Sequence, residues 1–211
     1  VEIEQQKTVV LKDISLKIEK GEFVYFVGKT GSGKSSLLKS LYGDVSVNNG
    51  SGTVLNCDII KAKRKKILAL RRKIGIIFQD FELLTDRSVA DNLKFIMKAT
   101  GWKGKQKIND SITELLEKVG MSDKANSFPH LMSGGEQQRI AIARALVNDP
   151  ELILADEPTG NLDPETSIQI MNLLNKIASN GKTIVMATHD YSIIEAFKGR
   201  VIKFENQNIS E

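Results

Sequence analysis

Residues 28–35, Gly-Lys-Thr-Gly-Ser-Gly-Lys-Ser, decide the fold of this chain. They fit the pattern G-x-x-x-x-G-K-[ST], in which glycines let backbone N–H groups turn inward around the phosphates of a nucleotide. Lys34 is expected to reach the β- and γ-phosphates, and the Ser35 hydroxyl to ligate Mg²⁺. The apolar run Phe23–Val27 before the loop is typical of a buried strand. Apolar residues at helical spacing over 34–42 then place the phosphates at a helix N-terminus.

The candidate nucleotide-binding residues are the loop and the start of the following helix. They are Gly28, Lys29, Thr30, Gly31, Ser32, Gly33, Lys34, Ser35 and Ser36. The alternative is a glycine-rich turn that matches the pattern by chance. Strand, loop and helix follow each other in the order that a phosphate-binding loop (P-loop) requires, so the sequence favours nucleotide binding over that alternative.

Length and composition indicate one domain covering residues 1–211, since 211 residues with 41% hydrophobic content can bury one good core. The single Cys57 can form no internal disulfide, and no Cys/His cluster has metal-ligand spacing. No apolar run approaches the roughly 20 residues that span a bilayer. We therefore expect a soluble protein of a reducing, cytoplasmic compartment.

The charge is spread unevenly along the chain. The net charge of +4, from 30 basic and 26 acidic residues, is too small to indicate nucleic-acid binding. One stretch between two predicted strands is strongly basic, however, through Lys61, Lys63, Arg64, Lys65, Lys66, Arg71, Arg72 and Lys73. It is either a solvated helix face or a contact for anionic lipid headgroups or an acidic partner.

The rest of the chain alternates between strand and helix patterns. Apolar and polar residues alternate over 9–19, which predicts an antiparallel strand with one wet face. Apolar runs at 74–78, 152–155 and 183–187 predict buried strands separated by helices. The predicted fold class is therefore α/β: a P-loop core with a mainly parallel sheet and an N-terminal antiparallel β subdomain. Residues 88–147 form a predicted helical subdomain inserted in that core, with an inward stripe of Ile108, Ile112, Leu115, Leu116 and Val119.

Two carboxylates close the predicted strand at 152–155. Asp156 and Glu157 would lie at the carboxyl edge of the sheet, where the P-loop also lies, in the arrangement called Walker B. Asp156 is expected to hold Mg²⁺, and Glu157 to act as the general base for an attacking water. Two acids at a strand end are often only a solvated turn, but the P-loop beside them favours the catalytic interpretation.

A second anion site is predicted at residues 132–139, Met-Ser-Gly-Gly-Glu-Gln-Gln-Arg. A serine and two glycines directly before a helix offer a hydroxyl, backbone N–H groups and the positive end of the helix dipole. The chain already has one P-loop for one nucleotide, so this site would serve the nucleotide of another subunit. The alternative is an ordinary capped helix start. The candidate residues are Ser133, Gly134, Gly135 and Glu136.

Together these motifs resemble those of the ABC-type ATPases, and the resemblance covers essentially the whole chain. It implies that Gln79 senses the γ-phosphate and ligates Mg²⁺ with Ser35 and Asp156, and that His189 is the switch histidine. It further implies that Asp163 is a subunit contact, that the cofactors are ATP and Mg²⁺, and that two chains sandwich ATP as a homodimer. The catalytic candidates are then Glu157, His189, Gln79 and Lys34.

Three positions depart from the family pattern. Met132 and Glu136 stand where the signature usually has Leu and Gln, and Glu136 adds negative charge near a phosphate. No aromatic residue precedes Phe23, and Glu4 lies near the place where the family stacks a tyrosine on adenine. Affinity for ATP is therefore expected to come mainly from the triphosphate.

Within the family, residues 83–89 and 157–163 resemble the branch of the lipoprotein-release ATPase LolD, the exporter ATPase MacB and the cell-division ATPase FtsE. The segment 86–89 favours an FtsE-like role. That resemblance implies an FtsX-like integral membrane partner, activation of cell-wall hydrolases, and a position on the inner face of the membrane. A LolD- or MacB-like ATPase is the nearest alternative. A DNA-associated ABC ATPase, in which the basic run at 61–73 would touch phosphates, is a second alternative, although such proteins usually carry long coiled-coil insertions and no heptad run occurs here. A non-hydrolytic binding module is disfavoured by Glu157 with His189.

Overall fold

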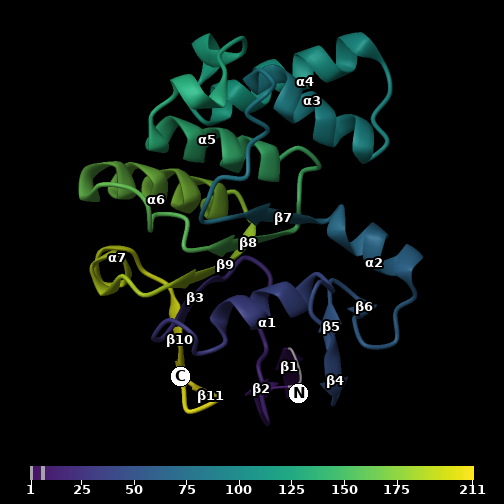
Figure 1. The fold of residues 1–211 in the computed structure, drawn as a ribbon, viewed down its shortest axis with the longest axis vertical. Coiled ribbons are helices and arrows are strands. Elements are labelled where there is room, and N and C mark those ends of the chain that lie inside the picture. Colours follow the sequence, from purple (N-terminus) through teal and green to yellow (C-terminus); the bar gives the residue numbers. More distant parts are fainter. Residues whose placement is uncertain (1, 6–7) are drawn as a thin grey trace.

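The computed structural model of the chain describes residues 2–5 and 8–211 (Figure 1). Within these residues, the centre is a six-stranded sheet in the spatial order β11 (Asn208–Ser210), β10 (Arg200–Glu205), β3 (Phe23–Val27), β9 (Thr183–Thr188), β8 (Leu152–Asp156) and β7 (Ile74–Ile77). The strands from β10 to β7 run parallel, and β11 pairs antiparallel with β10. This confirms the predicted α/β fold with a mainly parallel sheet.

Helices cover both faces of the sheet, and alternate side chains of each strand supply two separate cores (Figure 1). Phe23, Tyr25 and Val27 of β3 pack on the side of α5 (Gly134–Ala145) and α6 (Pro164–Ser179). Val24 and Phe26 of the same strand pack on the side of α1 (Lys34–Leu41). All five side chains are buried, as the continuous apolar run predicted. Each large apolar side chain buried in this way stabilises the fold by about 1.5–3 kcal/mol.

Residues 88–147, for which a helical subdomain is predicted, contain no strand among the described residues. They include α3 (Val89–Ala99), α4 (Lys105–Lys118), the short 3₁₀ turns at Ser122–Lys124 and Pro129–Leu131, and α5. The predicted inward stripe of α4 is buried and joins the core on the α5 side. Ser88 caps α3 by accepting a hydrogen bond from the backbone N–H of Asp91 at 3.2 Å. None of the helices in the described residues is long and apolar enough to cross a membrane.

The predicted strand over residues 9–19 is wrong in its length. A small antiparallel sheet contains β2 (Thr8–Leu11), β1 (Glu2–Gln5) and β4 (Val47–Asn49), and β2 ends at Leu11. Asp13 has a φ of 49°, a left-handed conformation that cannot continue a strand. The alternation remains visible in burial alone, because Ile14 is buried while Ser15 and Lys17 are exposed.

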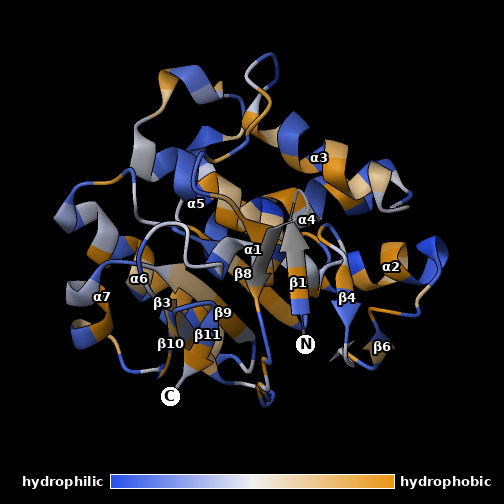
Figure 2. Ribbon diagram, turned by 60° about the horizontal axis from the view of Figure 1, so that its bottom comes forward, coloured by the Kyte–Doolittle hydropathy of each residue, from blue (hydrophilic) through white to orange (hydrophobic). Residues whose placement is uncertain are grey.

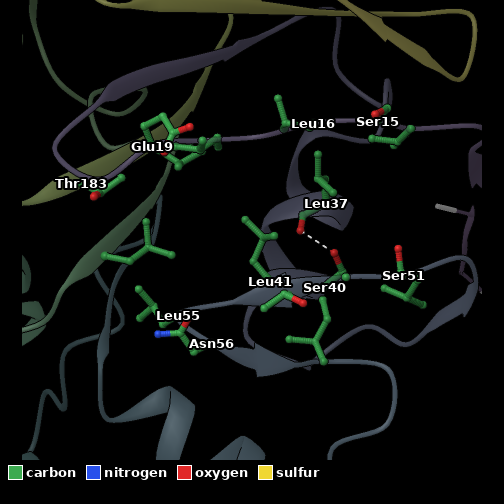
Figure 3. A pocket seen from close by; sticks show the side chains of 18 of the residues that line it. Ser15, Leu16, Glu19, Leu37, Ser40, Leu41, Ser51, Leu55, Asn56 and Thr183 are labelled. Carbon is green, nitrogen blue, oxygen red and sulfur yellow. Dashed lines mark hydrogen bonds between the residues drawn. The ribbon is translucent and has the colours of Figure 1, made fainter.

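Smaller elements complete the α1 side of the sheet. The hairpin of β5 (Thr53–Val54) and β6 (Cys57–Asp58) leads into α2 (Arg64–Arg71), which precedes β7. A cavity of about 750 Å³ lies between α1 and the segment after β2 (Figure 3). Two of its polar lining side chains are hydrogen-bonded within the chain: the Ser40 hydroxyl donates to the Leu37 carbonyl at 2.7 Å, and Thr183 Oγ1 accepts from the Gly21 N–H at 2.9 Å. None of its lining residues belongs to the P-loop.

Candidate active site

The parallel strands bring the first group of candidate residues to one edge of the sheet. β3 leads into the P-loop, β7 ends two residues before Gln79, β8 ends at Asp156, and β9 ends next to His189. The carboxyl ends of parallel strands share an edge, which is where open α/β sheets bind ligands. A pocket of about 370 Å³ at this edge is lined by Thr30, Gly31, Gly33, Lys34, Ser35, Ser36, Gln79, Glu157 and His189.

The P-loop geometry depends on glycine and leaves polar groups for a ligand. A Cβ atom at Gly28 would lie 2.6 Å from the Phe204 carbonyl oxygen, so a side chain there would displace the backbone of β10. Gly31 and Gly33 have φ values of 81° and 101°. No side chain among the described residues caps the first turn of α1, and the buried Ser32 hydroxyl finds no hydrogen-bond partner among them. An unpartnered hydroxyl beside a helix N-terminus without a side-chain cap fits a phosphate.

Lys34, Glu157 and His189 form one connected group. Lys34 is 6% exposed, and its Nζ atom donates to the carbonyls of Gly28 at 2.7 Å and Lys29 at 3.2 Å. The same atom lies 4.0 Å from Glu157 Oε1, which lies 3.0 Å from His189 Nδ1. Glu157 has a φ of 47°, and non-glycine residues held in this region cluster at functional sites. The strained backbone of Glu157 therefore places its carboxylate between the Lys34 ammonium and the His189 imidazole.

Asp156 and Ser35 fit a magnesium ion. The Ser35 hydroxyl donates to Asp156 Oδ1 at 2.9 Å, and Gln79 lines the same pocket. Hydroxyl, carboxylate and amide oxygens are the hard ligands that Mg²⁺ takes, usually together with phosphates and water. No cluster of three or more His, Cys, Asp and Glu in the described residues offers another metal site. Burial raises the pKa of Asp156, and the Ser35 hydrogen bond opposes this shift.

Exchanging Asp156 for asparagine should stabilise the nucleotide-free, metal-free protein at neutral pH. Because the pKa of Asp156 is higher in the folded chain than in the unfolded chain, ionisation begins to destabilise the folded state as the pH rises above the unfolded pKa, and the cost is complete above the folded pKa. Below the unfolded pKa of about 3.9 that cost disappears. The melting temperature of Asp156→Asn in EDTA should therefore exceed that of the wild type at pH 7, and the difference should shrink toward pH 4. Equal melting temperatures at pH 7 would contradict a desolvated carboxylate.

The serine of the second anion motif caps α5. Ser133 Oγ accepts from the Glu136 N–H at 3.3 Å, and the Ser133 N–H donates to Glu136 Oε2 at 2.8 Å, which is a capping box. Lys124 lies 2.8 Å from Glu136 and, as the largest cause, lowers the pKa of that carboxyl. The added negative charge of Glu136 is thus paired with a cation of the same chain. Met132, which stands where the family has Leu, is buried, as expected for a residue of similar volume.

The structure places the second group of candidates away from the P-loop pocket. Ser133, Gly134, Gly135, Glu136 and Asp163 do not line that pocket. They gather instead where α5 and α6 begin. A Cβ atom at Gly134 would lie 3.2 Å from the Leu162 side chain, and Asp163 caps α6 by accepting from the Thr166 N–H at 3.0 Å. Within one chain, the residues at the start of α5 and the P-loop pocket therefore remain separate.

Sequence patterns did not single out two residues that connect these regions. Gln138 is fully buried, and its Nε2 donates to the Pro158 carbonyl at 2.7 Å, which ties α5 to the turn after Glu157. Asn161 Nδ2 donates to the Gln79 carbonyl and to Asp80 Oδ1, each at 3.2 Å. A polar residue on the buried face of a predicted helix was the available signal for Gln138. The side chain of Glu4 lies outside the described residues.

Comparisons with known proteins agree with this geometry. A family model described as ABC transporter matches residues 11–160. The chain is 48% identical over 193 residues to the cell division ATP-binding protein FtsE of Mycobacterium tuberculosis, covering 92% of this chain and 84% of that protein. It is 45% identical over 202 residues to FtsE of Streptococcus pneumoniae, covering 96% and 87%. The solved dimer of the ATP-binding cassette MJ0796 with ADP and Pi superposes with a TM-score of 0.87 at 32% identity, over 100% of this chain and 93% of the other.

Proposed function

This chain belongs to the ABC transporter family of ATPases, and from that premise we propose that it is the ATP-hydrolysing subunit of an FtsE-like membrane complex in cell division. In this role the chain sits on the inner face of the membrane and works through an FtsX-like integral membrane partner that controls cell-wall hydrolases. Two relatives at 45% and 48% identity are named cell division ATP-binding proteins, and these names support the role.

The contact between Glu157 and His189 beside the buried Lys34 carries the catalytic part of the proposal. Hydrolysis forms a bond from a water oxygen to the γ-phosphorus and breaks the bond to the β–γ bridging oxygen. Glu157 accepts the proton of that water, and His189 holds the Glu157 carboxylate in place. Lys34 neutralises charge on the β- and γ-phosphates. When bound, Mg²⁺ supplies further neutralisation, and Ser35, Asp156 and Gln79 are the residues that would hold it.

Two chains are needed to complete each site in this proposal. The α5 half-site with Ser133 and the P-loop pocket lie apart in one chain, whereas a head-to-tail pair brings the α5 start of one chain to the ATP of the other. Two bound ATP molecules then hold the pair together, because a ligand shared between subunits stabilises their association. The MJ0796 cassette with ADP and Pi is described as dimeric, which supports this arrangement.

Replacing Ser133 by arginine should lower the ATP turnover of the assembled complex by at least about tenfold, since losing one charge-stabilising donor costs about 10²–10³ in other enzymes. The affinity of the P-loop for ATP should stay within about twofold, because Ser133 does not line that pocket. The matched control is Ser179→Arg. It changes an exposed serine at the C-terminal end of α6, whereas Ser133 lies near the beginning of that helix. Normal turnover by Ser133→Arg would rule out a shared site.

We place the membrane partner in a groove over α3. This groove of about 360 Å³ is lined by Asp86, Arg87, Ser88, Asp91, Lys94, Phe95, Lys98 and Phe128. Phe95 and Phe128 are 44% and 38% exposed, and the Arg87 guanidinium lies 4.9 Å from the centre of the Phe95 ring. Exposed aromatics rimmed by charges are typical of a docking site for a short amphipathic helix.

The groove is connected to the nucleotide pocket through the segment after Gln79. Arg144 of α5 donates to the carbonyls of Phe81 and Glu82, and Asn92 of α3 accepts from the Leu84 N–H at 2.8 Å. We propose that residues 88–147 move as one helical subdomain when Gln79 meets the γ-phosphate, and that this movement reaches the partner through the groove.

Reversing the charge of Arg87 and truncating Phe95, as Arg87→Glu with Phe95→Ala, should weaken partner binding by at least about tenfold. ATP affinity should not change, because neither residue lines the P-loop pocket. The control Lys176→Glu with Tyr191→Ala makes the same changes at an exposed lysine and at a tyrosine that is 63% exposed, both away from the groove. Crosslinks from the partner to residues 199–211 instead of the groove would show that this placement is wrong.

Identifying the membrane protein that purifies with this chain tests the whole proposal. An FtsX-like protein that raises ATP turnover on binding would support the cell-division role. A lipoprotein-release or exporter subunit in its place would favour the LolD- or MacB-like alternative. Neither outcome changes the assignment of the chain as an ATPase, which depends on its family and its site.

A further inference from the structure

Residues 61–73 carry a concentrated positive charge that ATP hydrolysis does not use. This segment has eight basic residues and no acidic one, and all eight are exposed. Without these eight, the 30 basic residues of the chain fall to 22 against 26 acidic residues, so the remainder carries a net charge of −4. We call the eight side chains the basic cluster: Lys61, Lys63, Arg64, Lys65, Lys66, Arg71, Arg72 and Lys73.

Only two members of the basic cluster are paired with acids in the described residues. Arg71 lies 3.8 Å from Asp44, and Lys73 lies 3.0 Å from Glu151. Arg71 also donates to the backbone carbonyls of Tyr42 and Gly43 at 2.9 and 3.0 Å, so its charge holds α2 against the core. The other six cations form no ion pair in the part of the chain that the structure describes, and of these only Lys61 and Lys66 interact electrostatically with a neighbouring acid, Asp58. All six side chains are exposed and can meet an external anion.

Helix α2 presents these cations around an exposed apolar side chain. Leu70 is buried and fixes the inner face of the helix. Leu68 on the outer side is 48% exposed. Arg64 and Lys65 precede Leu68 by four and three residues, and Arg72 follows it by four, so all three neighbour it on one helix face. A leucine among cations is the pattern of a helix that lies on a membrane surface.

The position of α2 agrees with a membrane contact. α2 and α3 both lie toward the right of Figures 1 and 2, while β10 and α7 (Tyr191–Ala196) lie toward the left. α3 carries part of the groove proposed for the membrane partner, so α2 and this element lie toward the same side in both views. Figure 2 also shows hydrophilic residues at both ends of α2 and hydrophobic residues between them.

We propose that the outer face of α2 and the loop before it bind the anionic headgroups of membrane phospholipids, with Leu68 entering the headgroup layer. The proposal rests on the proposed function for the orientation of the molecule, but the binding itself requires no partner. Each basic residue near an anionic surface strengthens binding by about fivefold. The long lysine and arginine side chains can reach phosphates while their methylene stems cover apolar surface.

Phospholipid fits this face better than nucleic acid does. Residues 61–73 contain no aromatic side chain on which a base could stack, although stacking is a main source of single-strand binding. The rest of the chain is acidic and would repel a long polyanion that extended beyond the cluster. A lipid surface needs only local contact, and it also accepts Leu68.

Flotation of the purified chain with vesicles, without nucleotide or partner, tests the proposal. Vesicles of equal parts phosphatidylglycerol and phosphatidylcholine should bind the chain at least about tenfold more tightly than phosphatidylcholine alone, at about 0.1 M salt where surface charges still act. Lys65→Glu with Arg72→Glu should weaken this binding by at least about tenfold. The matched control Lys198→Glu with Lys203→Glu alters net charge equally at two exposed lysines, one between α7 and β10 and one on β10, and should bind within about twofold of wild type.

A second pair of variants tests the apolar contact. Leu68→Ser should weaken vesicle binding by about threefold or more, whereas Ile168→Ser, which changes a side chain of similar exposure (49%) on α6, should not. Equal binding of wild type and Lys65→Glu with Arg72→Glu, or no preference for phosphatidylglycerol, would overturn the proposal. Displacement from vesicles by a short RNA at equal phosphate concentration would overturn it in favour of nucleic acid. ATP turnover of these variants, measured separately, shows whether the catalytic fold is intact.

Discussion

Replacing Glu157 by glutamine should lower ATP turnover by about 10²–10⁴-fold, the range for loss of a general base, and leave ATP affinity within about threefold. Glutamine has the shape of glutamate, so the pocket stays filled, but its amide cannot accept the proton of the attacking water. The carboxylate oxygen in question lies 3.0 Å from His189 Nδ1 and 4.0 Å from Lys34 Nζ. Asp156 is the neighbouring carboxylate, but it accepts the Ser35 hydroxyl hydrogen bond and is assigned to Mg²⁺, so we do not expect it to replace Glu157 as the base.

Single-turnover hydrolysis and equilibrium ATP binding, measured on the same Glu157→Gln preparation, separate chemistry from affinity. Glu151→Gln is the matched control, because Glu151 is an exposed acid that pairs with Lys73 and lies outside the pocket. With ATP and Mg²⁺ in excess, the variant should also accumulate as a dimer, since the shared nucleotides persist. Turnover within tenfold of wild type would assign the base to another group.

The sequence could predict the catalytic edge of the sheet because its determinants are local. An apolar run fixes each buried strand, and the residue after the run then falls at the carboxyl edge of a parallel sheet. Gln79 and Asp156 directly follow such runs, His189 comes two residues after the run at 183–187, and the structure brings their strand ends to one edge. The P-loop was predictable for the same reason, since strand, glycines and helix follow one another without a gap.

Features that depend on tertiary contacts could not be predicted. The end of β2 depends on the left-handed conformation of Asp13, which an alternating apolar pattern does not reveal. The role of Gln138 depends on the Pro158 carbonyl, 20 positions away along the chain. The pairing of Glu136 with Lys124 likewise required the fold, although the sequence had raised the problem of its charge. The periodicity of apolar residues predicts which face of a helix or strand is buried. It does not predict which backbone group of another element will contact a side chain on that face.

The separation of the two half-sites links these findings to assembly. The sequence predicted more anion-binding sites than one nucleotide needs, and the structure keeps Ser133 away from the pocket that contains Lys34. In the proposed dimer, hydrolysis and dimerisation are coupled through the same ATP molecule. A variant of the P-loop should consequently lose both properties, whereas a variant of Glu157 should lose only hydrolysis.

Replacing Lys34 by alanine should lower ATP affinity by at least about 100-fold, because hydrogen bonds to charged groups are worth about 1.5–3 kcal/mol each. In the nucleotide-free protein, Lys34 Nζ is held by the carbonyls of Gly28 and Lys29 inside the loop. The charge of this buried ammonium is already in position before binding, so the phosphates of ATP can replace the two carbonyls as its partners with little movement. Isothermal titration with ATP and Mg²⁺ gives the affinity, and light scattering should show that the ATP-dependent dimer is lost as well.

Lys34→Met separates the charge from the space that the side chain fills. Methionine occupies nearly the same volume in this buried position, so it should bind ATP as poorly as alanine while melting closer to wild type. Lys29→Ala is the control for surface charge in the same loop, since that side chain is exposed, and it should change affinity by less than about fivefold. ATP binding by Lys34→Met at wild-type strength would mean that the backbone N–H groups alone hold the phosphates, and the role assigned to Lys34 would then be wrong.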